Sequence, residues 1–255
     1  MRMSKFRKES VENLQLALDK MPKKLKDSIY FVIPAFNEGR AIGDVISILN
    51  NNNFFKLVIV DDGSSDNTSQ VVLDLKTKKG LVLLKHAINR GQGASLKTGI
   101  DYALNEDECK YIVTFDSDGQ HRITDLPKFI SVLERGLCDI AIGSRFLKKE
   151  SRRLVPMKKR ILLKGALLIT LFLSNIKLTD THNGYRVMNK KAARKIDINM
   201  DGFEHASEIL DEIAKKRVRY VEVPTFIDYT EYSKQKGQKI SNSIKIFMKM
   251  IFRNS

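Results

Sequence analysis

The regular alternation of short apolar runs with helix-length stretches constrains the fold of this chain more than any other feature. Largely apolar runs occur at residues 29–33, 56–60, 81–84, 111–115 and 139–142. Runs of this length are typical of buried strands, and the stretches between them are long enough for helices. Strands that alternate with helices predict an α/β fold with a mainly parallel central sheet and helices on both faces.

The second half of the chain is less regular than the first. We expect an apolar helix over residues 161–178, a turn at 183–184, a helix over 204–216 and a strand over 218–226. A chain of 255 residues is long enough for one large domain with short appendages. The expected parts are a charged helical extension (1–27), the α/β domain (28–226), and a basic loop with an amphipathic helix (227–255).

The chain is strongly basic, with a net charge of +15 and a pI near 9.7. This charge indicates an anionic partner, which is nucleic acid, anionic lipid or a phosphorylated substrate. No nucleic-acid-binding motif is found, and aromatic residues do not interleave with the basic run, so we expect no nucleic-acid partner. The cysteines, Cys109 and Cys138, fit no metal or disulfide pattern and are expected to be free thiols in a reducing compartment.

The sequence favours a protein at the surface of a membrane rather than across it. The N-terminal residues lack the apolar region of a secretory signal. The apolar stretch 161–178 contains Lys164 and Lys177, so we interpret it as a buried or interfacial helix. Residues 243–253 form a basic amphipathic pattern that fits an anionic membrane, the protein core or a second copy of the chain. We therefore expect a cytoplasmic, peripheral protein at the inner face of the cell membrane.

Two acidic side chains, Asp116 and Asp118, directly follow the fourth predicted strand. Residues two apart in an extended chain point the same way, and a divalent cation relieves the repulsion between two carboxylates. Mn²⁺ or Mg²⁺ held here, with Gln120 as a further ligand, would neutralise a departing diphosphate. The alternative is a solvated loop that caps the next helix.

Polar loops also follow the second and third predicted strands. Asp61 and Asp62 suit hydrogen bonds to a ribose or a nucleobase, and an Asx-type turn at this position is compatible with that role. Asn89, Gly91 and Gly93 follow the next strand, and the glycines permit close approach of a ligand to the backbone. The spacing is not that of a dinucleotide-binding fingerprint, which argues against a dehydrogenase.

Together these loops resemble those of the family-2 glycosyltransferases, especially the polyprenyl-phosphate sugar synthases and the bacterial cell-surface glycan glycosyltransferases. The matching segments are IPAFNE (33–38), VDDGSSD (60–66), NRGQGA (89–94), FDSDGQ (115–120), GSRF (143–146), DTHNGYR (180–186) and EVP (222–224).

The resemblance implies a GT-A fold over residues 28–226 and an inverting transfer from a nucleotide-diphosphate sugar. It also implies a phosphate-contacting role for Arg145, to which a guanidinium group is suited. The metal would be held by Asp116, Asp118 and Gln120. The expected nucleotide-sugar-binding residues are Pro34, Phe36, Glu38, Asp61, Asp62, Asn89, Gly91, Gly93, Asp116, Ser117 and Asp118.

The acceptor is either a hydroxyl of a lipid-linked or cell-surface glycan, or a polyprenyl phosphate. A hydroxyl needs a general base, for which Asp180 with His182 is the candidate; the alternative is that Asp180 caps a turn and His182 packs. A phosphate needs cations instead, and segment 232–238 differs from the corresponding synthase segment, which favours a glycan acceptor. The candidate cations for an acceptor phosphate or lipid headgroups are Arg152, Arg153, Arg160, Lys234 and Lys236.

A catalytically silent nucleotide-binding subunit is a further alternative, and the intact Asp116 and Asp118 pair argues against it. The sequence leaves open the donor sugar, its nucleobase and whether the chain forms a homo-oligomer.

Overall fold

Strand β1 (Ile29–Ala35) is buried along its whole length, which explains why its sequence is apolar throughout. Its side chains alternate between two separate cores: Ile29 and Phe31 pack into one, and Tyr30 and Val32 into the other. A strand that buries both faces must have a helical layer on each side of its sheet.

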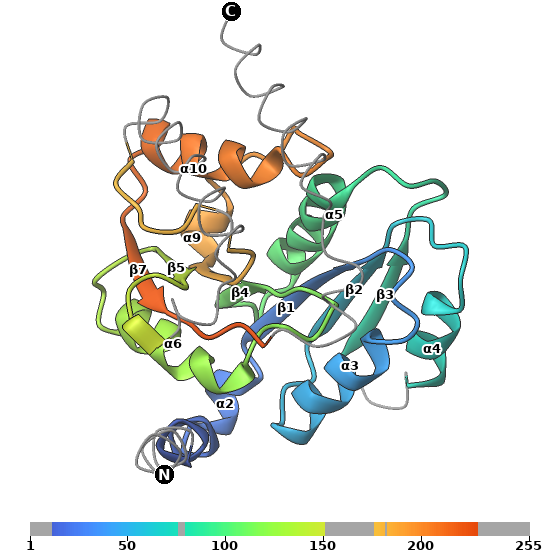
Figure 1. Ribbon diagram of the computed structural model, residues 1–255, viewed down its shortest axis with the longest axis horizontal. Helices are drawn as coiled ribbons and strands as arrows, with labels where there is room; N and C mark the ends of the chain where they lie inside the picture. The colour runs from blue at the N-terminus through green and yellow to red at the C-terminus, as the bar shows by residue number, and fades with distance from the viewer. Residues whose placement is uncertain (1–11, 76–79, 151–175, 182, 229–255) are drawn as a thin grey trace, which may run out of the picture.

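The computed structural model describes residues 12–75, 80–150, 176–181 and 183–228. In this part of the chain seven strands form one sheet in the order β3-β2-β1-β4-β6-β5-β7 (Figure 1). Neighbouring strands are parallel except at β6, which runs antiparallel to both β4 and β5. The expected mainly parallel sheet is thus confirmed. The other strands are β2 (Leu57–Asp61), β3 (Leu81–Lys85), β4 (Tyr111–Thr114), β5 (Ile140–Ser144), β6 (Arg186–Asn189) and β7 (Tyr220–Pro224).

Helices cover both faces of the sheet (Figure 1). On one face lie α3 (Ile42–Asn51), α4 (Thr68–Asp74) and α6 (Leu126–Glu134), the last preceded by a short 3-10 helix, Ile123–Asp125. The opposite face is covered by α5 (Gln92–Asn105), α9 (Lys190–Ala193) and α10 (His205–Lys215).

The N-terminal extension is part of the domain from residue 12 onward. Residues 12–19 are helical and are followed by α2 (Lys23–Lys26). Leu18 is fully buried in the core beneath α3 and α6, and the buried Lys26 donates from Nζ to the carbonyl oxygen of Asn52 at 3.1 Å. The predicted boundary at residue 27 therefore falls within a continuous packed unit.

The second half of the chain differs from the predicted elements in two places. Strand β6 was not predicted, since it has only four residues and opens with a charged arginine, Arg186. Residues 176–178 end the predicted apolar helix but are not helical, and Ile176 and Leu178 are buried in the core beneath α5 and α10. The rest of that predicted helix, like segment 243–253, lies outside the described residues. Among the described residues, no helix has the length and apolar character required to cross a membrane.

Aromatic rings fill the core between the sheet and α6. Tyr185 is fully buried, stacks on Phe129 with ring centroids 4.5 Å apart, and meets Phe115 edge-on at 5.3 Å. Its hydroxyl makes no hydrogen bond, whereas the hydroxyl of the buried Tyr111 donates to Glu134 at 2.7 Å.

The two tyrosines give a matched test of this packing. Tyr185→Phe removes a buried hydroxyl that lacks a partner, so we expect the free energy of unfolding to rise by up to about 1 kcal/mol. Tyr111→Phe removes a satisfied hydroxyl and should lower it by roughly 1 kcal/mol. Urea titrations of both variants check this, and a loss of stability in Tyr185→Phe would show that its hydroxyl has a partner.

Candidate functional site

The loops with the predicted site residues meet at one edge of the sheet. Strands β1, β2 and β4 end at this edge, and the antiparallel strand β6 begins there. In register, Arg186 of β6 lies between Thr114 at the end of β4 and Ile142 of β5. The alternation of strands and helices predicted this convergence for the parallel strands.

The loop after β1 is tied to the loop after β2 by Asn37. Its backbone has a φ of 53°, a conformation that asparagine tolerates better than most residues. Its side-chain oxygen accepts the N–H of Ser65 at 2.9 Å, and its own N–H donates to the hydroxyl of Ser64 at 2.9 Å. These bonds fix the loop that presents the predicted nucleoside-binding residues.

The predicted nucleoside-binding residues of this loop differ in exposure. Pro34 is buried within β1, opposite Val60 of β2. Phe36 is 42% exposed, and its ring offers an apolar surface at the site edge. Glu38 is buried, and its N–H donates to the hydroxyl of Thr68 at 2.8 Å.

Asp61, at the end of β2, has a local role. It is 1% exposed, accepts the N–H of Ser64 at 2.9 Å, and also accepts a hydrogen bond from the hydroxyl of Ser69. One of its oxygens thus holds the turn and the other holds the first turn of α4, which fits the Asx-type turn expected from the sequence.

Asp62 joins the loop after β2 to the loop after β3. Its carboxylate accepts the N–H of Arg90 at 3.0 Å and that of Gly91 at 2.6 Å. His86 Nδ1 lies 2.6 Å from the same carboxylate, and His86 Nε2 lies 3.0 Å from the hydroxyl of Thr98. In this structure Asp62 anchors a loop, and its contact with a nucleoside stays a prediction.

The glycines of the next loop have a structural reason for their identity. A Cβ atom on Gly93 would lie 1.9 Å from the carbonyl oxygen of Met200, and one on Gly91 would lie 2.3 Å from that of Asp201. The N–H groups of Gly93 and Ala94 both donate to the Asp201 carbonyl, at 2.7 and 3.2 Å. The close approach expected for a ligand is therefore made by the chain itself, while Asn89 is exposed beside it.

Asp116 and Asp118 lie just beyond β4, with Ser117 buried between them. Asp116 accepts a hydrogen bond from the Gln92 side chain at 3.2 Å and packs so closely on Gly184 that a Cβ there would lie 2.7 Å from its oxygen. Gln120 donates its backbone N–H to Asp118 at 3.0 Å and its side-chain amide to the same carboxylate. Gln120 thus supports Asp118 by donating hydrogen bonds to it. The side-chain nitrogen that faces the carboxylate is a hydrogen-bond donor and does not bind metals.

Histidine and arginine side chains near Asp116 affect its pKa. Burial raises the pKa of Asp116, but His121, Arg186 and His205 outweigh it and hold that pKa below its ordinary value. His121 Nε2 lies 2.8 Å from Asp116 Oδ2 without the geometry of a hydrogen bond. Burial lowers the pKa of Arg186 to about 10 and that of His205 to about 4, so the arginine stays charged and the histidine neutral at pH 7.

The Asp116 and Asp118 pair fits a divalent cation. Burial, and then the charge of Asp116, raises the pKa of Asp118, which shows that the two anions disfavour each other. A cation relieves this repulsion, and Mg²⁺ or Mn²⁺ is commonly held by one or two carboxylates with waters and phosphate oxygens. The described residues contain no set of three or more His, Cys, Asp or Glu side chains arranged for a metal.

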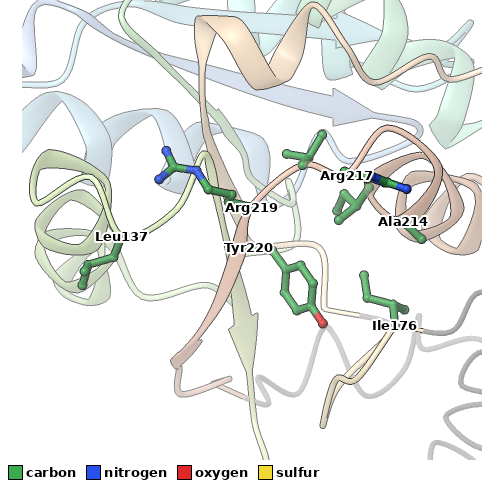
Figure 2. Close-up of a pocket in the computed structure, with 8 residues that line it drawn as sticks. Leu137, Ile176, Ala214, Arg217, Arg219 and Tyr220 are labelled. Atoms are coloured by element: carbon green, nitrogen blue, oxygen red, sulfur yellow. The ribbon is translucent and has the colours of Figure 1, made fainter.

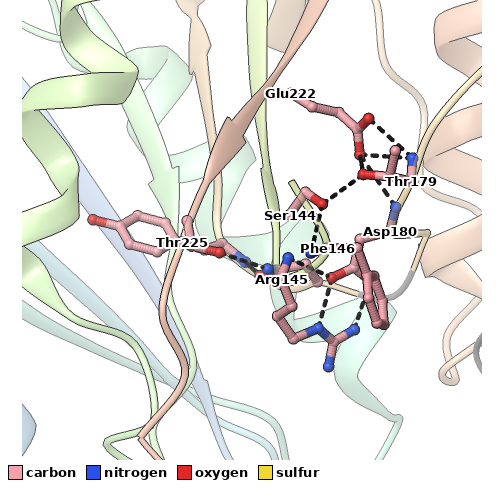
Figure 3. A network of polar contacts seen from close by, with 9 residues as sticks. Ser144, Arg145, Phe146, Thr179, Asp180, Glu222 and Thr225 are labelled. Carbon is pink, nitrogen blue, oxygen red and sulfur yellow. Dashed lines mark hydrogen bonds and ion pairs between the residues drawn. The ribbon is translucent and has the colours of Figure 1, made fainter. Parts of the chain in front are cut away.

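Arg145, next to the end of β5, forms a buried ion pair with Asp180 (Figure 3). Its Nε and one terminal nitrogen each donate to a different carboxylate oxygen at 2.6 Å, and its backbone N–H donates at 3.1 Å. Arg145 is 5% exposed and Asp180 is 2% exposed. A carboxylate held in a bidentate ion pair is a poor proton acceptor, so this geometry argues against the expectation that Asp180 is a general base.

Some predicted residues lie outside the described part of the chain. They are His182, Arg152, Arg153, Arg160, Lys234 and Lys236.

A separate pocket lies near the start of β7, at the other end of the strands from Asp116 and Asp118. It is lined by residues that include Leu137, Ile176, Ala214, Arg217, Arg219 and Tyr220 (Figure 2).

Three functional candidates were missed from the sequence. His86 and His121 contact predicted acidic residues, and Arg186 is buried beside Asp116 and Asp180. The signal for Arg186 was a charged residue at the start of an apolar stretch, which is a pattern that a surface position produces equally well.

The fold is that of the GT-A glycosyltransferases. The chain is similar in structure to a glucosyl-3-phosphoglycerate synthase from Mycobacterium tuberculosis crystallised with Mg²⁺ and uridine diphosphate. The TM-score is 0.62 at 16% sequence identity, with 95% of this chain and 83% of that chain covered. This identity is low, so the likeness defines the fold alone.

The sequence comparisons define the family. Residues 30–197 match the model of glycosyl transferase family 2, and the chain belongs to this family of glycosyltransferases. It is 31% identical over 240 residues to the UDP-N-acetylglucosamine–dolichyl-phosphate N-acetylglucosaminyltransferase of Methanococcus voltae, covering 88% of this chain and 94% of that protein. It is also 38% identical over 231 residues to uncharacterized protein MJ1222 of Methanocaldococcus jannaschii, covering 89% and 93%. The resemblance found from the motifs is confirmed.

The buried ion pair can be tested by stability. Asp180→Asn leaves the buried Arg145 without a counter-charge, so we expect the free energy of unfolding to fall by about 3 kcal/mol. Asp101→Asn is the matched control, because Asp101 forms an exposed pair with Lys97 at 3.6 Å and should change stability by less than about 0.5 kcal/mol. Chemical denaturation measures both, and equal effects would contradict the buried pairing.

Proposed function

We propose that the protein is an inverting, metal-dependent glycosyltransferase that moves a sugar from a nucleotide-diphosphate sugar to a polyprenyl phosphate at a membrane surface. The observation that carries this proposal is the pairing of Asp180 with Arg145 at the same sheet edge as Asp116 and Asp118. The pairing holds a guanidinium group in a fixed orientation beside the donor site and leaves Asp180 poorly suited to activate a hydroxyl.

The donor side is formed by the loops after β1, β2 and β4. In the proposal, Phe36 and Glu38 contact the nucleoside, while Asp116 and Asp118 hold Mn²⁺ or Mg²⁺. A cation held there would neutralise the negative charge that develops on the leaving diphosphate. Hydrogen bonds from Gln92 and Gln120 orient the carboxylates before substrate arrives.

The acceptor side is formed by the segment after β5 and the segment before β6. A lipid phosphate is already an anion near neutral pH and needs no base to become a nucleophile. Arg145 is suited to bind such an anion, because its planar guanidinium matches the geometry of phosphate oxygens. The relative from Methanococcus voltae, named for a dolichyl-phosphate acceptor, supports this choice over a glycan hydroxyl.

In this proposal the transfer is a single displacement. An acceptor phosphate oxygen attacks the anomeric carbon on the face opposite the diphosphate, and the bond between that carbon and the diphosphate oxygen breaks. The electron pair leaves with the nucleoside diphosphate, and the configuration at the anomeric carbon inverts. The protein contributes by holding the two charged substrates in line, which reduces the entropic cost of their meeting.

Nucleotide binding tests the donor site. We expect one of UDP, GDP, CDP or dTDP to raise the thermal midpoint by about 5–10 °C at roughly 100 times its Kd, and only with Mn²⁺ present. Asp118→Ala should abolish the shift, and the exposed Asp101→Ala should retain it. No metal-dependent shift with any nucleotide would remove the donor-site assignment.

Acceptor choice tests the second half of the proposal. Given the nucleotide sugar identified by that panel, we expect transfer to a short polyprenyl phosphate and none to the polyprenol of the same length, because the alcohol needs a base. The measurement is the formation of radiolabelled lipid in detergent. Efficient transfer to the polyprenol, or to a glycan but not the phosphate, would contradict the phosphate acceptor.

A further inference from the structure

Glu222 on β7 accepts a cluster of hydrogen bonds from the segment that carries Asp180 (Figure 3). The N–H of Thr179 lies 2.9 Å from each of its carboxylate oxygens. The Thr179 hydroxyl donates to it at 2.9 Å, and the N–H of Asp180 donates at 3.1 Å. Glu222 thus binds the N–H groups of two consecutive residues.

This contact continues to Arg145 through Asp180. The Asp180 backbone is held by Glu222, and its side chain accepts two guanidinium hydrogen bonds and the backbone N–H of Arg145. Ser144 supports the arrangement from the other side, because its hydroxyl lies 2.6 Å from the Thr179 hydroxyl. A movement of the Thr179 backbone would therefore reorient the guanidinium.

The register of the sheet explains why Glu222 can reach this segment. In the described sheet β7 is the outermost strand and pairs with β5, with Glu222 opposite Ile142. Arg145 follows the end of β5 directly, so both partners of the chain of contacts are fixed by the same pair of strands. The neighbouring Pro224 lies opposite Ser144 in the same register.

We propose that Glu222 is a positioning residue for the acceptor phosphate, acting through Asp180 on Arg145. The inference rests on the proposed function, since it takes Arg145 as the phosphate-binding cation. Glu222 does not touch the substrate in this proposal. It fixes the Thr179 and Asp180 backbone so that the guanidinium already has the orientation that the acceptor phosphate requires.

The test is the separate measurement of KM for the two substrates. Glu222→Gln replaces one carboxylate oxygen with an amide that faces N–H donors, so we expect the KM for polyprenyl phosphate to rise about tenfold, equivalent to about 1.4 kcal/mol. The KM for the nucleotide sugar should stay within about twofold. Thr179→Val, which removes only the hydroxyl contacts, should give a smaller rise and serves if the first variant fails to fold.

Two controls separate positioning from a general structural effect. Glu134→Gln removes a comparable carboxylate, which bonds Lys110 and Tyr111 near the opposite edge of the sheet, and should change neither KM. In an Arg145→Lys background, Glu222→Gln should add little, because residues that act through one another are not additive.

The outcomes distinguish this inference from the proposed function. Unchanged acceptor KM in both Glu222→Gln and Thr179→Val, equal rises for the two substrates, or full additivity with Arg145→Lys would each overturn the role of Glu222. Absence of transfer to polyprenyl phosphate by the unmodified enzyme would instead remove the proposed function, and the inference with it.

Discussion

Negative charge gathered at one edge of the sheet is the constraint on which the rest of the site depends. Asp116, Asp118 and Asp180 lie at this edge, where burial makes an unbalanced anion costly. The protein balances them with the buried Arg186, with the ion pair to Arg145, and with N–H donors from the loops. The charge of Asp116 disfavours ionisation of Asp118, and a divalent cation held by the pair would offset both negative charges.

The antiparallel strand β6 joins the two halves of the site. It pairs with β4, which leads to the donor carboxylates, and with β5, which leads to Arg145. Because Arg186 is the first residue of β6, the strand that connects β4 and β5 in the sheet also places a buried cation between the residues proposed to bind donor and acceptor. In the proposed function, strand pairing as well as loops would align the two substrates, which is the preorganised geometry that catalysis by positioning requires.

The sequence predicted the elements whose apolar pattern is strong and missed those that depend on tertiary pairing. Strands such as β1 and β2 were predicted to within a few residues, because burial on both faces leaves an unbroken apolar run. Strand β6 was missed because its pairing with β4 and β5 is not encoded in its own four residues. The site loops were predicted as a set, since strand ends must converge.

The individual roles at the site were less predictable than its location. In the structure Asp61, Asp62 and Gln120 hold loops or a neighbouring carboxylate, and Asp180 pairs with Arg145, while their contacts with substrate stay predictions. An acidic residue at the end of a predicted strand indicates that its carboxylate needs hydrogen-bond donors. Which residues donate depends on segments far away in the sequence. The partner of Asp180 is Arg145, 35 residues away along the chain, and spacing alone does not reveal it.

The packing of residues 200–202 against α5 has a consequence for how anions can bind. In many nucleotide-binding folds the free N–H groups at the first turn of a helix hold the phosphates directly. In this chain the first-turn N–H groups of Gly93 and Ala94 are taken by the Asp201 carbonyl. That route to anion recognition is closed at α5 by the protein's own backbone. In the proposed function, a diphosphate would therefore be held by the cation and by side chains rather than by the N–H groups of Gly93 and Ala94, and chelation of the cation would release it.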